Sequence, residues 1–255
     1  MQRGKLIKTA DEIAKMTRAG EILAGGLREV KKSIKPGITG LELDAIFERY
    51  VKRHGGSCVF FGYQPEGADK PYPASICVSP NEVIVHGTPN KKPLKAGDIV
   101  SVDVGVNYQG YCADAAITVA VGKASPLVKK LIEVTRKSLE LGIAAAKPGN
   151  TLGDIGYAIQ THITDNGFKV AKGLTGHGIG TALHEDPHVY NEGRSGEGMK
   201  LSPGMCLALE PMVGVGTGKI VQLPDDSYAI ADGSLSAHFE HTIVITEKGN
   251  RILTA

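Results

Sequence analysis

The sequence carries the same order of secondary-structure signals twice, and this internal duplication limits the folds that the chain can adopt. The segment KPGIT at 35–39 recurs as KPGNT at 147–151, and helix signals stand on both sides of each copy. Each predicted helix opens on a capping residue that is followed by a helical apolar pattern. The four capping residues are Thr9, Thr39, Ser125 and Thr151.

Apolar strand segments follow the helix pair in each copy, at 94–103 and 112–122, and again at 201–210 and 238–249. The order of two helices and two strands, present twice, predicts an α+β fold in which two pseudo-symmetric αβ halves pack together. We expect a single domain over residues 1–255, with halves at approximately 9–122 and 125–249. The alternative is a coincidental use of common helix caps.

Composition excludes several classes of protein. Hydrophobic residues make up 42% of the chain, which is too many for a disordered protein, and the net charge of +2 offers no general nucleic-acid footprint. No apolar stretch reaches about 18 residues, so no membrane span is expected. The first residues lack the apolar run of a signal peptide, and the four cysteines form no CxxC pair. We therefore expect a cytoplasmic protein with free, buried thiols.

Four carboxylates interrupt the apolar strand segments, namely Asp103, Asp114, Glu210 and Glu240. A buried carboxylate must be neutralised, paired or bound to a metal. A single one is usually a hydrogen-bonded structural residue. Four of them, in matching pairs in matching halves, favour a shared explanation, and two divalent cations would balance their charge.

Three histidines stand in contexts that suggest a role beside these acids. Glycines flank His177 in TGHGIG, His184 follows in LHEDP, and His86 lies in VIVHGTP. An oxygen-rich ligand set with one imidazole and no thiolate suits Co, Mn or Fe, with Zn or Ni as alternatives. The remaining histidines without such a context are interpreted as structural or surface residues: His54, His162, His188 and His238.

Taken together, these motifs resemble the type I methionine aminopeptidases, in the short bacterial-like form. The residues that carry the resemblance are GDIVSVDVG with ADAA, and the segments VSPNEVIVHGTP (78–89), TGHGIGTALHEDP (175–187), SPGMCLALEPMV (202–213) and DGSLSAHFEHTIVIT (232–246). The resemblance implies the pita-bread (creatinase/aminopeptidase) fold, with a curved, mainly antiparallel sheet covered by helices.

The resemblance also implies the roles of individual residues. Five ligands would hold two divalent ions: Asp103, Asp114, His177, Glu210 and Glu240. Asp114 and Glu240 would bridge the ions, Asp103 would bind one of them, and His177 with Glu210 would bind the other.

For the substrate, the resemblance implies a catalytic set of His86, His184 and Glu210, in which both histidines contact the substrate near the scissile bond. Cys77, Tyr72 and Leu183 would line the methionine pocket. The chain departs from the family pattern at three places. Leu183 replaces an aromatic residue, no Trp precedes DGSLSA, and the segment 64–71 is an extra loop.

The expected activity, by the same resemblance, is hydrolysis of the N-terminal methionine of nascent proteins. The expected nucleophile is a water activated by two metal ions, because no GxSxG or Cys–His nucleophile is found. The alternatives are an Xaa-Pro aminopeptidase or creatinase-like enzyme and a catalytically inactive pita-bread binding protein. We expect a monomer with no DNA or membrane partner. Lys91, Lys92 and Lys95 are interpreted as a solvated loop, with transient ribosome contact as the alternative.

Overall fold

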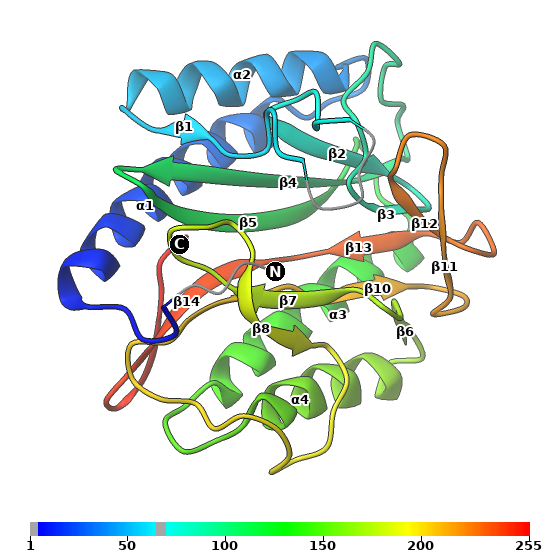
Figure 1. Cartoon of the computed structure of the whole chain (residues 1–255). Coiled ribbons are helices and arrows are strands. Elements are labelled where there is room, and N and C mark those ends of the chain that lie inside the picture. Colours follow the sequence, from blue (N-terminus) through cyan, green and yellow to red (C-terminus); the bar gives the residue numbers. More distant parts are fainter. Residues whose placement is uncertain (1–4, 65–69) are drawn as a thin grey trace.

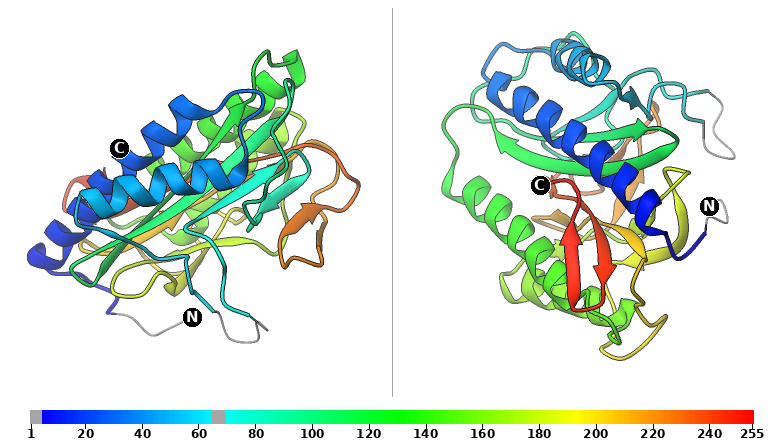
Figure 2. Two further views of the ribbon diagram at one scale, coloured as in Figure 1. Left: turned by 90° about the horizontal axis from the view of Figure 1, so that it is seen from above. Right: turned by 90° about the vertical axis from the view of Figure 1, so that its left-hand side faces the viewer.

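The computed structural model describes residues 5–64 and 70–255. In this part of the chain, two helix pairs lie on the outside and antiparallel sheets lie between them (Figures 1 and 2). One pair packs on the sheet of the first half and the other on strands of the second half. The helices are α1 (Ala10–Ser33), α2 (Gly40–Arg53), α3 (Pro126–Ala145) and α4 (Leu152–Asp165).

The first sheet is built around a long hairpin. Strands β4 and β5 pair along their whole length through a tight turn at Gln109 and Gly110, where φ is 51° and 85°. Positive φ at both turn residues matches the right-handed twist of the two strands. The strands of this sheet are β1 (Ser57–Cys58), β2 (Ile76–Pro80), β4 (Ile99–Tyr108) and β5 (Tyr111–Ala120).

The second half holds a five-stranded sheet in the order β15-β14-β9-β7-β8. Its strands are β7 (Thr175–Gly178), β8 (Glu185–Tyr190), β9 (Cys206–Leu209), β14 (His241–Thr246) and β15 (Gly249–Ile252). Two small sheets complete the fold. Their strands are β3 (Val83–Val85), β6 (Lys169–Val170), β10 (Met212–Gly214), β11 (Ile220–Gln222), β12 (Tyr228–Ile230) and β13 (Ser236–His238).

The helices begin where the capping residues predict. Thr9, Thr39 and Thr151 form complete capping boxes, and Ser125 caps the third helix ahead of Pro126. Each helix then buries one apolar face against its sheet. The cores beneath the two pairs are separate clusters, which include Leu43, Phe47 and Val51 in one and Leu131, Ile155 and Ile159 in the other. No described helix is long and apolar enough to cross a membrane.

Two of the sequence expectations are wrong in detail. The segment 238–249 is not a continuous strand, because β13 ends at His238 and β14 starts at His241. Glu240 lies in this break because its N–H donates to the carbonyl of Ala116 on β5, 2.9 Å away. The chain therefore crosses from one sheet to the other at Glu240. In addition, Cys58 is half-buried, although the other three thiols are buried as expected.

A buried ion pair ties the start of the chain to the second sheet. Lys8 Nζ lies 2.7 Å from Glu185 Oε2, and the side chains are 4% and 1% exposed. The other Glu185 oxygen accepts the N–H of Ala182 at 3.0 Å, so the same carboxylate also closes the turn before β8. Removing one member of such a pair leaves an uncompensated buried charge.

Lys8→Met should therefore lower the free energy of unfolding by about 3–5 kcal/mol, measured by urea denaturation. Lys5→Met is the matched control, because Lys5 is 60% exposed and pairs with Glu12 at the surface. Such a surface pair contributes at most about 1 kcal/mol. Equal losses in the two variants would contradict this account of the buried pair.

Candidate metal centre

Strand register brings the acids of the first half to one face of the β4–β5 hairpin. Asp103 lies opposite Ala116, and Gly105 lies opposite Asp114. Residues that face each other across an antiparallel pair point to the same side, and so do residues two apart on one strand. Asp103 and Asp114 are therefore diagonal neighbours on the same face.

The register of the second half extends this face. His177 lies opposite Ala208, and Ala208 lies opposite Thr242. Glu210 stands two residues beyond Ala208, and Glu240 stands two residues before Thr242, so both alternate to the same side as His177.

Hydrogen bonds between β5 and the segment around Glu240 join the two sheets. The N–H of Asp114 donates to Thr242 Oγ1 at 2.8 Å, and this hydroxyl donates to the Asp114 carbonyl, also at 2.8 Å. The bond from the Glu240 N–H to the Ala116 carbonyl lies beside them. All five predicted ligands therefore come from neighbouring positions of a joined set of strands.

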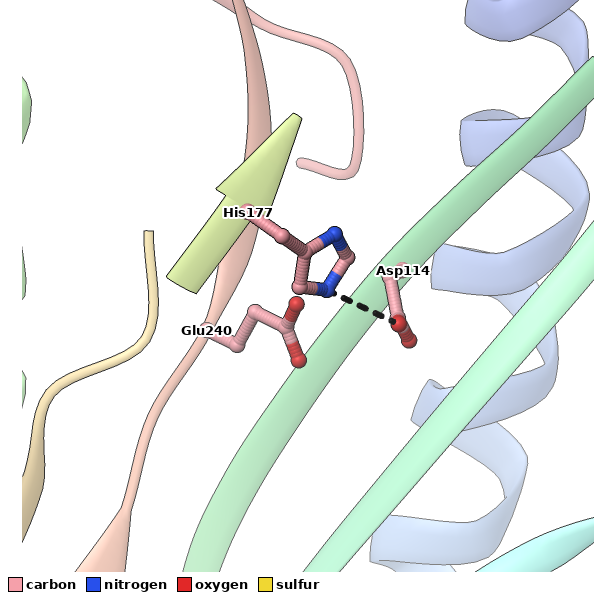
Figure 3. A group of neighbouring side chains, drawn as sticks. All are labelled: Asp114, His177 and Glu240. Carbon is pink, nitrogen blue, oxygen red and sulfur yellow. Dashed lines mark ion pairs between the residues drawn. The ribbon is translucent and has the colours of Figure 1, made fainter. Parts of the chain in front are cut away.

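Three of the five ligand side chains form a tight cluster (Figure 3). One donor atom from each of Asp114, His177 and Glu240 lies within 4.8 Å of the others. His177 Nε2 is 4.0 Å from Asp114 Oδ2 and 3.4 Å from Glu210 Oε1. Asp103 is linked to the cluster through its charge, which raises the pKa of Asp114 and of Glu240.

Several polar atoms of this cluster are buried without a hydrogen-bond partner among the described residues. They are Asp103 Oδ1, Asp114 Oδ1 and Glu240 Oε1. Buried carboxylate oxygens normally have partners, so these unpartnered atoms fit a site that binds a cation.

The donor chemistry fits a divalent metal as well. His177 Nδ1 donates to the carbonyl of Gly178 at 2.8 Å, which leaves the Nε2 lone pair facing the acids, as metal-ligating histidines require. Two donors that each lie about 2.0–2.2 Å from one ion are about 3.4 Å apart at a tetrahedral angle. The separation of 3.4 Å between His177 Nε2 and Glu210 Oε1 matches this value.

Burial, with repulsion between neighbouring acids as a further cause, raises the pKa values of these carboxyls when no cation compensates them. Burial, with the Glu210 charge as a further cause, raises the pKa of Asp103 to about 7. Burial also raises the pKa of Glu210 to about 7, against the opposing effect of His177. The pKa values of Asp114 and Glu240 rise well above the usual range for the same reasons. A cation in the cluster would reverse these shifts.

His86 and His184 are neutral imidazoles beside the cluster. Burial, with the charges of His177 and His86 as further causes, lowers the pKa of His184 to about 3. Desolvation of its ring, with the charge of His238 as a further cause, lowers the pKa of His86, although the residue as a whole is exposed. The His184 ring meets the His177 ring edge-on, with 4.5 Å between centroids. His86 has a φ of 61°, a conformation that is rare without glycine and concentrated at functional sites.

The three predicted pocket residues share one apolar cluster next to the acids. Cys77 on β2 lies directly opposite Asp103 on β4 and is buried together with Leu183. Tyr72 packs against the same cluster, and its hydroxyl donates to the carbonyl of Gly87 at 2.9 Å. For the missing Trp, the structure offers Tyr228 on β12, whose ring centroid is 5.9 Å from that of His86. Residues 65–69 of the extra loop lie outside the described residues.

His238 is one of the residues beside the acids to which the sequence assigns no role in the site. The sequence interprets it as structural or surface; it is 1% exposed, and its Nε2 lies 3.6 Å from Glu210 Oε2. Neither ring nitrogen has a hydrogen-bond partner among the described residues. The available signal was its position two residues before Glu240, which favours the same side of the chain. Glu210 thus stands between two imidazoles, those of His177 and His238.

Comparison with known proteins decides the family. The model of metallopeptidase family M24 matches residues 14–247. Methionine aminopeptidase 1 of Bacillus subtilis is 46% identical over 250 residues, which cover 98% of each chain. The crystal structure of methionine aminopeptidase from Thermotoga maritima is 46% identical, has a TM-score of 0.93, and covers 97% of this chain and 98% of its own.

The chain belongs to the methionine aminopeptidases of metallopeptidase family M24. The predicted pita-bread fold is thereby confirmed, as is the resemblance to the short bacterial form. An Xaa-Pro dipeptidase from Bacillus anthracis shares the fold at a TM-score of 0.78 and 26% identity, and this chain spans 62% of its length. The match to the methionine aminopeptidases is therefore the stronger one.

The raised carboxyl pKa values predict how stability changes with pH in metal-free protein. Above about pH 7.5 the histidines with lowered pKa values are almost fully neutral in the folded and the unfolded protein, because an unfolded histidine titrates near about pH 6.5. The acids of the cluster, in contrast, bind more protons in the folded than in the unfolded protein. Stability therefore falls as the pH rises, by up to about 1.4 kcal/mol per pH unit for each carboxyl. Urea unfolding at several pH values, in the presence of a chelator, measures this slope.

Two substitutions and the addition of metal test whether these acids cause the pH dependence of stability. Glu240→Gln should reduce the slope, whereas Asp154→Asn should leave it unchanged, because capping contacts lower the pKa of Asp154 to about 2 and it is ionised throughout. A saturating divalent metal should abolish the slope, because it binds the deprotonated acids. A free energy of unfolding that is constant or rises over this pH range would contradict the electrostatic account.

Proposed function

We propose that the chain is a metallo-aminopeptidase that hydrolyses the N-terminal methionine of nascent proteins and peptides, with two divalent ions (Co, Mn or Fe, with Zn or Ni as alternatives). The observation that carries this proposal is the buried cluster of acids with a bare histidine nitrogen, in a chain 46% identical to methionine aminopeptidase 1 of Bacillus subtilis. A site of this composition fits catalytic metals better than a structural zinc.

The proposed ligand assignment comes from the family resemblance, and the geometry supports it. Asp114 and Glu240 belong to the same cluster of donor atoms as His177 and would bridge the two ions. His177 and Glu210 would hold one ion, supported by their donor separation of 3.4 Å. Asp103 would hold the other ion, from its place on the same face of β4. Divalent ions so bound lower the pKa of water toward about 7 and polarise a carbonyl.

The side chains around the cluster would handle the protons of peptide hydrolysis. Glu210 lies between two imidazoles and keeps about 12% exposure, so its carboxylate can take a proton from water and pass it to the leaving amine. His86 and His184 are neutral at working pH because their pKa values are low. Each can therefore offer an N–H to the carbonyl oxygen or the scissile amide as charge develops.

The proposed methionine pocket is the apolar cluster beside Asp103. Cys77, Leu183 and Tyr72 supply thiol, aliphatic and aromatic surface, which suits an unbranched thioether side chain. Tyr228 supplies aromatic surface on the His86 side in place of the missing Trp.

Further proposals concern the domain organisation, the location and the partners of the chain. Proposed ligands from both halves of the chain support a single catalytic domain over residues 1–255, and nascent-chain substrates and free thiols support a cytoplasmic location. The monomeric state stays a prediction. Lys91, Lys92 and Lys95 are exposed. They fit the solvated loop that the sequence predicts, and transient ribosome contact stays a prediction.

Purified protein supplied with Mn²⁺ or Co²⁺ should release methionine from a Met-Gly peptide, measured by chromatography of the products. His177→Ala and Glu210→Ala should each lower kcat/KM at least about a hundredfold, because each removes a metal ligand. His188→Ala is the matched control, since His188 is exposed on β8 and its ring has a hydrogen bond to Thr175 alone among the described residues. Its kcat/KM should stay close to that of the wild type.

Three outcomes would contradict the proposal in different ways. Cleavage of Ala-Pro peptides in preference to Met-Gly peptides would favour the Xaa-Pro alternative. Absence of cleavage with every metal, together with no metal retained on gel filtration, would favour the inactive binding protein. Near-normal turnover by His177→Ala would remove the ligand assignment.

A further inference from the structure

Tyr63 makes a direct contact with one of the proposed catalytic histidines. Its hydroxyl oxygen lies 2.7 Å from Nδ1 of His184, and the two rings meet edge-to-face with 5.3 Å between centroids. The backbone of Tyr63 is fixed as well. Its N–H donates to the Phe60 carbonyl at 2.9 Å, and its carbonyl accepts the N–H of Tyr72 at 2.8 Å. These two backbone hydrogen bonds therefore fix the position from which the Tyr63 side chain extends.

His177 and His184 have Nδ1 partners of opposite kinds. The partner of His177 is the backbone carbonyl of Gly178, which can only accept, so Nδ1 carries the proton and Nε2 is bare. The partner of His184 is a phenol, which can donate. A phenolic O–H is a better donor than an imidazole N–H, and an imidazole nitrogen is a better acceptor than a phenolic oxygen. This difference favours donation from Tyr63 to Nδ1 of His184.

We propose that Tyr63 is a positioning residue that donates its hydroxyl hydrogen bond to Nδ1 of His184 and thereby keeps the imidazole proton on Nε2. The inference rests on the proposed function, because it assigns His184 a single task there. With Nε2–H, His184 donates a hydrogen bond to the substrate and cannot accept a proton from water. Proton acceptance then falls to Glu210.

The surroundings of the pair support this assignment. Burial raises the pKa of Tyr63, so the phenol keeps the proton that it donates. The His184 ring is partly buried, and a neutral imidazole carries a single N–H whose position its hydrogen-bond partner decides. Adjacent histidines thus adopt opposite tautomers, one suited to bind metal and the other to donate to the substrate.

Nitrogen-15 NMR of the imidazole rings measures the tautomer directly, already in the wild type. In metal-free, isotope-labelled protein, with the His184 signals assigned by their loss in His184→Ala, Nδ1 should have the shift of an unprotonated nitrogen and Nε2 that of a protonated one. Tyr63→Phe should move both shifts toward a mixture of tautomers. A protonated Nδ1 in the wild type would overturn the proposal.

Kinetics separate a positioning role from a structural one. Tyr63→Phe should lower kcat on a Met-Gly peptide about tenfold with little change in KM, the size expected for one lost hydrogen bond. Tyr111→Phe is the matched control, because Tyr111 is also partly buried and loses a hydroxyl bond, to Glu12 at 3.3 Å. Its kcat should match that of the wild type.

A double variant gives the decisive comparison. If Tyr63 acts through His184, Tyr63→Phe should cause no further loss of kcat in the His184→Ala background. A full additional tenfold loss would overturn the proposal. The tautomer measurement needs no activity, so failure of the positioning role and failure of the proposed function are distinguishable. The predicted tautomer in a chain that cleaves no peptide would contradict only the proposed function.

Discussion

The desolvation of four clustered carboxylates, reinforced by repulsion among them, is the constraint on which the rest of this structure depends; Asp114 and Glu240 are buried, and Asp103 and Glu210 are partly buried. Asp103, Asp114, Glu210 and Glu240 each raise the pKa of at least one of the others or have their own raised by burial. Among the described residues, the ion pairs that reach these acids come from His177 and His238, with no Lys or Arg. The fold therefore holds its acids in a state that a cation relieves. On this account, metal binding and catalysis use the same uncompensated charge.

Strand register produces most of this arrangement. Alternation along β4, β5 and β7 sends Asp103, Asp114 and His177 to one face, whereas Glu210 follows the end of β9 and Glu240 precedes the start of β14. The hydrogen bonds between β5 and the Glu240–Thr242 segment bring the two halves together. Side chains on paired strands are held more precisely than side chains on loops. The two helix pairs bury the opposite faces of these sheets and so keep the register fixed.

The sequence predicts the side chains of the candidate site better than it predicts the backbone contacts that hold them. Helix starts followed from capping residues, and the acids were found because apolar neighbours make a carboxylate conspicuous. The break at Glu240 was missed because its backbone pairs with Ala116, a contact that no local pattern encodes. Tyr63 and Tyr228 were missed for a similar reason, since their partners His184 and His86 lie far along the chain. Strand alternation could have placed His238 on the same side as Glu240, but no motif surrounds this histidine.

Anomalous diffraction from crystals grown with Mn²⁺ tests the central claim most directly. The account predicts two anomalous peaks within the cluster, with Asp114 and Glu240 touching both, His177 and Glu210 touching one, and Asp103 touching the other. Two ions about 3.5–4 Å apart are the usual spacing of such catalytic pairs. Peaks that avoid these five side chains, or a cluster without any peak at saturating Mn²⁺, would contradict the claim that metal compensates the buried acids.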